Sequence, residues 1–99
     1  MVETEERTGS VIFIGKKPVS HYLASCFDLV NADHNRIWIE GMGQNITKVV
    51  DIVNYFRRFC TQGDVCIKDF EIDMVPKKVV HGLPKHVSRL RILLEVEKT

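Results

Sequence analysis

The sequence predicts a single α/β domain, a two-layer sandwich in which two helices cover a four-stranded mixed sheet in the order β-α-β-α-β-β. Two observations predict this fold. A short apolar run followed by helical periodicity occurs twice, and the last third of the chain alternates apolar with polar residues instead. Strand-helix-strand connections are typical of parallel pairing, whereas two consecutive alternating strands favour an antiparallel hairpin.

The first strand and the first helix are expected on either side of Gly15. An apolar run at residues 11–14 suits a strand that is buried on both faces, and Gly15 closes it. After two lysines, Pro18 is suited to the first position of a helix, where its missing N–H is not needed. Apolar residues then recur at steps of three and four through residues 19–30, which predicts an amphipathic helix.

A second strand and a second helix repeat this arrangement. Residues 37–39, Ile-Trp-Ile, predict a buried strand that is closed by Gly41 and Gly43. Apolar residues recur at helical spacing over residues 46–56, and we expect this helix to end within residues 60–63. Two helices leave the other face and the edges of the sheet open, and dimerisation is the expected way to cover them.

The last third of the chain predicts a long antiparallel hairpin. Residues 70–74 alternate apolar with polar side chains, as do residues 90–96 except at Leu93, and half-exposed strands show this pattern. The apolar residues that precede residue 68 are out of phase with the first of these strands, so we expect a bulge or twist at residues 68–69. Residues 76–86, between the two strands, contain two prolines, one glycine and no acidic residue, and they predict a cationic loop.

Composition indicates a soluble cytoplasmic protein without metal, cofactor or membrane association. Residues 1–9 predict a flexible acidic N-terminal arm without the apolar stretch of a signal peptide, and residues 10–99 predict one domain. No apolar run reaches the ~20 residues that span a bilayer. The three cysteines lack CxxC spacing, which indicates neither a disulfide framework nor a zinc ribbon. A disulfide between Cys60 and Cys66 remains a hypothesis.

The charge of the chain is nearly balanced but unevenly placed. Lys and Arg number 14 against 13 Asp and Glu, which gives a formal net charge of +1 and excludes a histone-like polycation. Residues 1–8 hold three glutamates and one arginine, so the rest of the chain carries +3. Three expected loops carry lysines, and two of them adjoin helix N-termini, where free N–H groups and the helix dipole favour phosphate. The lysines in expected loops or beside them are Lys16, Lys17, Lys48, Lys77, Lys78 and Lys85.

Residues 11–19, Val-Ile-Phe-Ile-Gly-Lys-Lys-Pro-Val, resemble the opening signature of the Alba family of nucleic-acid-binding proteins. The similarity continues through residues 37–43, Ile-Trp-Ile-Glu-Gly-Met-Gly, then residues 46–51, Ile-Thr-Lys-Val-Val-Asp, and again at residues 87–88, Val-Ser. It covers roughly residues 10–97. This resemblance implies the β-α-β-α-β-β fold, a dimer, and binding of double-stranded DNA and of RNA without marked sequence preference. Archaeal members of the family coat and condense DNA in chromatin.

The resemblance also implies which residues form the sites. The two lysines of the Gly-Lys-Lys-Pro motif would lie centrally on the nucleic-acid surface, and the hairpin would reach along the minor groove. Contacts between subunits or between dimers would come from the second helix, and one lysine is the candidate for acetylation. The nucleic-acid residues are Lys16, Lys17, Gln44, Asn45, Lys48, Lys77, Lys78 and Lys85, the interface residues are Tyr55, Arg57, Phe59 and Cys60, and the candidate for acetylation is Lys16.

The sequence departs from the family pattern at two places. Archaeal members usually have Arg-Gly-Arg where this chain has Met-Gly-Gln at residues 42–44, and often a phenylalanine at the position of Cys60. Two missing cations per subunit predict weaker binding and a flatter salt dependence, since each phosphate contact contributes ~0.9 to the log–log slope. The amides of Gln44 and Asn45 can bond phosphate or 2′-hydroxyl oxygens, which suits RNA at least as well as DNA.

Two functions therefore follow from the sequence. The main hypothesis is a dimeric, non-enzymatic protein that binds DNA and RNA and organises the nucleoid. The alternative is an interaction subunit that pairs with a more basic Alba paralogue or joins a ribonucleoprotein. No catalytic constellation supports an enzyme, because the alternating carboxylates Asp69, Glu71 and Asp73 lack a partner motif and are interpreted as a solvated strand face.

Overall fold

The computed structural model describes the backbone of residues 9–98 and their side chains, except those of residues 78–80, 83 and 84. The predicted acidic arm lies outside this range apart from Gly9. The elements are β1 (Ser10–Phe13), α2 (Val19–Asn31), β2 (Arg36–Met42), the short 3-10 helix η1 (Gly43–Asn45), α3 (Ile46–Phe59), β3 (Gly63–Val80) and β4 (Leu83–Lys98). This is the predicted order, with one short helical turn added before α3.

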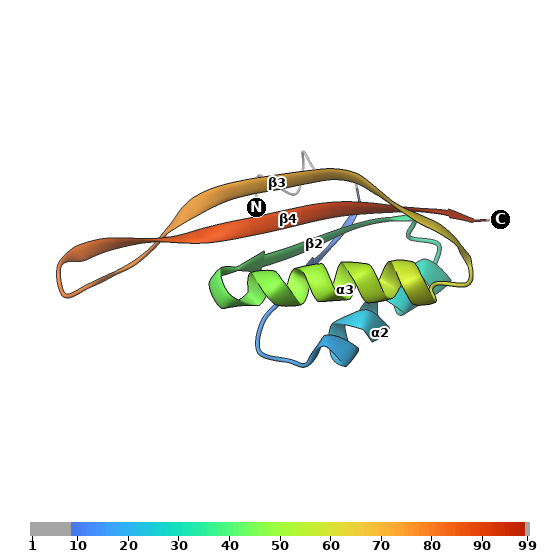
Figure 1. Ribbon diagram of the computed structural model, residues 1–99, viewed down its shortest axis with the longest axis horizontal. Coiled ribbons are helices and arrows are strands. Elements are labelled where there is room, and N and C mark those ends of the chain that lie inside the picture. The colour runs from blue at the N-terminus through green and yellow to red at the C-terminus, as the bar shows by residue number, and fades with distance from the viewer. Residues whose placement is uncertain (1–8, 99) are drawn as a thin grey trace.

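The four strands form one mixed sheet in the order β1-β2-β4-β3. β1 runs parallel to β2, while β4 lies between β2 and β3 and is antiparallel to both. Both helices lie on the same side of this sheet (Figure 1). The predicted two-layer α/β sandwich with a four-stranded mixed sheet is confirmed.

The core lies between the two helices and the sheet face that they cover. Apolar side chains of α3 meet those of β2 and β4 there, which explains the helical spacing of one set and the alternation of the other. Phe27 of α2 packs edge to face against Phe56 of α3, with ring centroids 5.3 Å apart. The largest fully buried side chains are Phe56, Ile37, Ile39, Ile52 and Leu94.

Two local predictions about the first strand and helix are wrong. β1 is an edge strand, and Phe13 is 62% exposed rather than buried. An apolar run alone does not tell an edge strand from a central one. Pro18 precedes α2 as its N-cap, with φ −70° and ψ 161°, instead of occupying the first helical position. The proline ring fixes φ at a value that both conformations share.

The hairpin of β3 and β4 is longer than the alternation predicted. Residues 76–86, expected to form a loop, are strand except for a tight turn at His81 and Gly82, whose φ angles are 54° and 76°, and the pairing has a register shift between Lys77 and Val80. Positive φ at both positions is typical of a type I′ turn. The register shifts between Ile67 and Asp69, which confirms the expected bulge. The end of the hairpin projects beyond the body of the molecule (Figure 1), and we call residues 76–86 the arm.

Candidate nucleic-acid interface

The loop between β1 and α2 carries the lysine pair and is held by two buried or half-buried side chains. The Tyr22 hydroxyl oxygen accepts hydrogen bonds from the backbone N–H of Gly15 at 2.8 Å and of Lys17 at 3.2 Å. The Lys48 ammonium, from α3, donates to the carbonyl oxygens of Gly15 at 2.7 Å and of Lys17 at 2.8 Å. The side chains of Lys16 and Lys17 are exposed. Lys48, predicted to contact phosphate, is therefore engaged with the loop itself.

The end of β2 turns into α3 through two glycines with different roles. A Cβ at Gly41 would lie 2.5 Å from Cγ2 of Val49, so glycine permits the close approach of β2 to α3. Gly43 has φ +55°, in the left-handed region that glycine adopts readily. The turn that results leaves Gln44 exposed and Asn45 half-buried at the start of α3.

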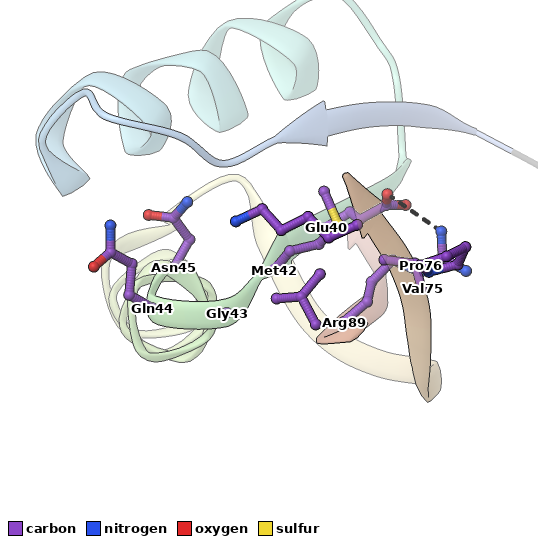
Figure 2. Close-up of a pocket in the computed structure, with 10 residues that line it drawn as sticks. Glu40, Met42, Gly43, Gln44, Asn45, Val75, Pro76 and Arg89 are labelled. Carbon is purple, nitrogen blue, oxygen red and sulfur yellow. Dashed lines mark ion pairs between the residues drawn. The ribbon is translucent and has the colours of Figure 1, made fainter. Parts of the chain in front are cut away.

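A cavity of about 720 Å³ lies where η1 meets the base of the arm. Figure 2 shows Gln44 and Asn45 on one side of it and Val75 and Pro76 on the other, with Met42 between them. Lys77 also lines this cavity. The fold thus brings together three of the residues predicted for nucleic-acid binding, two amides and one ammonium, from segments more than 30 residues apart in the sequence.

Arginines neutralise part of the acidic strand face. Arg89 binds Asp73 through two hydrogen bonds, Nε to Oδ1 at 2.8 Å and Nη2 to Oδ2 at 2.5 Å, and lies 4.0 Å from Glu40. Arg91 pairs with Glu71 at 2.5 Å and with Asp73 at 3.3 Å. The hydrogen bond from Arg89 and the charges of both arginines hold the pKa of Asp73 below its usual value, against the effect of desolvation. The predicted solvated strand face is thus partly an ion-pair network.

The arm places like charges opposite each other. Lys77 of β3 and Lys85 of β4 are direct cross-strand partners, and both are exposed. Side chains paired in this way lie on one face with Cβ atoms about 5 Å apart, and like charges there repel. A polyanion bound along the arm would relieve this repulsion. The side chain of Lys78, the third predicted lysine of the arm, lies outside the described residues.

The residues predicted for contacts between subunits lie in the C-terminal half of α3. Tyr55 and Phe59 are exposed and stack with ring centroids 6.1 Å apart, and the Arg58 guanidinium lies 5.9 Å from the Phe59 ring centroid. Arg57 and Cys60 line a separate hollow of about 400 Å³ beside the start of β3. A second hollow, lined by Tyr55, shares Arg58 with the first, so the four residues lie on neighbouring parts of one surface.

Sequence reasoning missed an exposed apolar strip on β3, formed by Phe70, Ile72 and Met74. These side chains are 63%, 72% and 62% exposed. The register places Phe70 opposite Ile92 and Ile72 opposite Leu90, so the strip continues the face that the helices cover elsewhere. Alternation predicted an apolar face on this strand, but only the width of the helical layer decides whether that face is covered.

The cysteines are free thiols, and the disulfide considered between Cys60 and Cys66 is not formed. Cys26 is fully buried, and burial raises the pKa of its thiol to about 12. Across residues 9–98 no three His, Cys, Asp or Glu side chains gather where a metal ion would be held. None of the helices in that range has the length and apolar character needed to cross a membrane.

The fold and the site together define a small α/β domain with exposed lysines on the hydrogen-bonded loop between β1 and α2 and on a projecting arm. A sequence model of the Alba family matches residues 10–68. The chain belongs to the Alba family.

Two archaeal relatives match nearly the whole domain. The DNA/RNA-binding protein Alba of Nanoarchaeum equitans is 32% identical over 86 residues, which cover 84% of this chain and 93% of that protein. The protein of the same name from Methanothrix thermoacetophila is 32% identical over 85 residues, 85% of this chain and 92% of the relative.

Solved structures of the family share the fold. Alba from Thermoplasma volcanium superposes with a TM-score of 0.79 at 28% identity, over 86% of this chain and 98% of that one. ALBA1 from Trypanosoma brucei has a TM-score of 0.68 over 91% of this chain and 71% of that chain, and at 15% identity it supports the fold alone.

Proposed function

We propose that this protein binds DNA and RNA without sequence preference, acts as a dimer, and organises the chromosome in the cytoplasm through contacts with phosphates. The observation that carries this proposal is the exposed pair Lys16 and Lys17 on a loop whose backbone is fixed by four hydrogen bonds. The two archaeal relatives are named as DNA/RNA-binding proteins, which supports both ligands.

Binding is electrostatic and needs little readout of bases. Lysine ammonium groups act as point charges toward phosphate, and each contact releases condensed counterions from the nucleic acid. Lys16 and Lys17 supply the central contacts, and Lys77 and Lys85 extend them along the arm. Contacts with phosphate fix the position of the protein but carry no sequence information. The proposed binding is therefore non-specific and weakens as salt is added, less steeply than it would with the two additional cations of archaeal members.

RNA is a ligand at least as suitable as DNA, because of the amides at the base of the arm. Gln44 stands where archaeal members of the family usually carry an arginine, Asn45 follows it, and both line the cavity together with Lys77. An amide donates and accepts hydrogen bonds, so it can bond a 2′-hydroxyl as well as a phosphate oxygen. Lys16, exposed at the centre of the surface, is the proposed acetylation site, since acetylation would remove its charge.

The dimer is proposed to form through the apolar strip on β3. The strip continues the core face of the sheet beyond the helices, and a two-fold axis would place it against its own copy. Its occupant is thus a second copy of this chain, and the strip and the edge of β3 are covered together. We assign the stacked pair Tyr55 and Phe59, with Arg57 and Cys60, to contacts between dimers.

The test of nucleic-acid binding reverses the charge of the lysine pair. Lys16→Glu with Lys17→Glu should abolish binding to duplex DNA and to structured RNA in ~50 mM salt, with an unchanged circular-dichroism spectrum. A milder pair, Lys16→Gln with Lys17→Gln, is compared with Lys68→Gln and Lys98→Gln, which remove the same charge from lysines paired with Glu95 and Asp33. Unchanged affinity after either double substitution at Lys16 and Lys17 would contradict the proposal. So would a loss of affinity in the Lys68→Gln/Lys98→Gln control equal to that in the Lys16→Gln/Lys17→Gln chain.

The alternative function, an interaction subunit that pairs with a more basic Alba paralogue or joins a ribonucleoprotein, is favoured by a different observation. The net charge is only +1, and Arg89 and Arg91 are paired with carboxylates. Mixing the protein with a basic paralogue and separating the species by native mass spectrometry decides between the two. Homodimers alone after mixing, together with nucleic-acid binding by those homodimers, would exclude the alternative.

A further inference from the structure

We infer that Tyr22 and Lys48 are positioning residues for the nucleic-acid site, and that Lys48 acts through the loop rather than by contacting phosphate. Their side chains hold the backbone on both sides of Lys16, so that the lysine pair is presented in one arrangement. We call these two side chains, Tyr22 and Lys48, the clamp. Its effect on binding rests on the proposed function, whereas its effect on the loop is tested without nucleic acid.

The clamp brackets Lys16 symmetrically. The residue before it, Gly15, and the residue after it, Lys17, each give their N–H to Tyr22 and their carbonyl oxygen to Lys48. The two lone pairs of a phenol oxygen are its full capacity as an acceptor, and both are used here. Four hydrogen bonds from two side chains thus fix three consecutive residues of a loop that has no regular secondary structure.

Each side chain of the clamp is itself held. Tyr22 is 7% exposed and belongs to the core cluster, so its hydroxyl has a fixed position on α2. The Lys48 ammonium approaches the Tyr22 ring, 6.0 Å from its centroid, at the outer range of a cation–π contact. Because Lys48 belongs to α3, the loop is tied to both helices, and the bond to Gly15 spans 33 residues of sequence.

The geometry argues against a direct phosphate contact by Lys48. An ammonium group has three N–H donors and no acceptor, and two donors point at carbonyl oxygens 2.7 and 2.8 Å away. Only the third donor is left for a phosphate while both bonds hold, and moving the ammonium out of the loop to meet one would break these charge-assisted bonds and release the loop that carries Lys16 and Lys17. Holding that backbone before binding reduces the conformational freedom that is lost on binding. The positive charge of Lys48 therefore serves the site mainly by ordering its neighbours.

A double-mutant cycle separates positioning from direct contact. Tyr22→Phe and Lys48→Met are made in the wild-type chain and in the Lys16→Gln/Lys17→Gln chain, and affinity for a duplex of about 20 base pairs is measured in ~50 mM salt. We expect each to weaken binding about fivefold in the wild type and less than about twofold in the neutralised chain, since residues that act as one unit are not additive. Lys68→Met, at a lysine paired with Glu95 outside the proposed binding site, is the matched control, with no expected change.

Two outcomes of the cycle would overturn the inference. If Lys48→Met still weakens binding about fivefold in the neutralised chain, Lys48 contacts the nucleic acid itself. If Tyr22→Phe leaves the affinity of the wild-type chain unchanged, the clamp has no role in binding. Thermal unfolding is measured for every variant, and should Lys48→Met fail to fold, Tyr22→Phe, which keeps the buried ring, decides alone.

Amide hydrogen exchange in the free protein tests the clamp independently of nucleic acid. Tyr22→Phe should speed exchange at the N–H groups of Gly15 and Lys17 about tenfold or more, with no change along β2. Unchanged exchange at both amides would show that the hydroxyl does not hold the loop, and would overturn the inference. Faster exchange at both, combined with full affinity in the Lys16→Gln/Lys17→Gln chain, would instead keep the clamp and reject the proposed binding function.

Discussion

The apolar strip on β3 can be tested by one substitution, Ile72→Thr. Ile72 is 72% exposed in the single chain, and full burial of an isoleucine side chain is worth about 1.5–3 kcal/mol. A two-fold dimer buries two copies, so the substitution should cost about 2–4 kcal/mol of dimer stability. The dissociation constant should then rise about 30- to 700-fold. Threonine keeps the β-branched shape that strands favour, so the fold of each subunit should be retained.

Sedimentation equilibrium over a wide range of protein concentrations measures this change. The matched control is Phe13→Thr, which removes a 62% exposed apolar side chain from the strand at the opposite edge of the sheet. Dimer dissociation should change in the first variant and stay constant in the second, while urea unfolding of the monomer changes little in both. A wild-type chain that remains monomeric at high concentration, or an unchanged dissociation constant for Ile72→Thr, would refute the assignment of the strip.

Three further predictions concern salt, pH and packing. Neutralising Lys16 and Lys17 to Gln should lower the slope of log affinity against log salt on duplex DNA by about 1.8 per subunit, and an unchanged slope would mean that neither lysine contacts phosphate. The pKa of Asp73 is lower in the folded than in the unfolded chain, so its contribution to stability is present above pH ~4 and is lost as pH falls through the folded pKa. Asp73→Asn should therefore make the unfolding free energy, measured with urea, fall less steeply below pH ~4. Gly41→Ala would place a Cβ 2.5 Å from Val49 and should cost about 1–3 kcal/mol in urea unfolding, with partial recovery in the Gly41→Ala/Val49→Ala chain; equal stability of all three chains would contradict it.

Much of the fold could be predicted because its signals are local. The helical spacing of apolar residues gave α3 close to its observed bounds, Ile46–Phe59, and a break in alternation gave the bulge after Ile67. The exposure of Phe13 and the length of the arm could not be predicted in this way. The exposure of Phe13 depends on which strand lies at the edge of the sheet. The length of the arm depends on whether a neighbouring strand would require a hydrogen bond from the position of a proline such as Pro76, which has no N–H.

In the candidate site, too, the features set by a short segment could be predicted and those set by distant segments could not. The lysine pair follows from the Gly-Lys-Lys-Pro motif, because a motif is a short continuous segment. The partners of Lys48 could not be predicted, since they lie 31 and 33 residues away in the sequence and are reached only after both helices have packed. The pairing of Arg89 with Asp73 likewise depends on a register that the bulge sets.

The opposed ammonium groups of Lys77 and Lys85 give salt two contrary effects on this protein. In the free chain, mobile anions screen the repulsion between them, so added salt should steady the tip of the hairpin. During binding the same anions occupy the place that a phosphate would take, and added salt weakens the complex. Small anions and nucleic acid thus compete as counterions for the same pair of charges. At low ionic strength the bound nucleic acid orders the hairpin, and at high ionic strength the screening anions do.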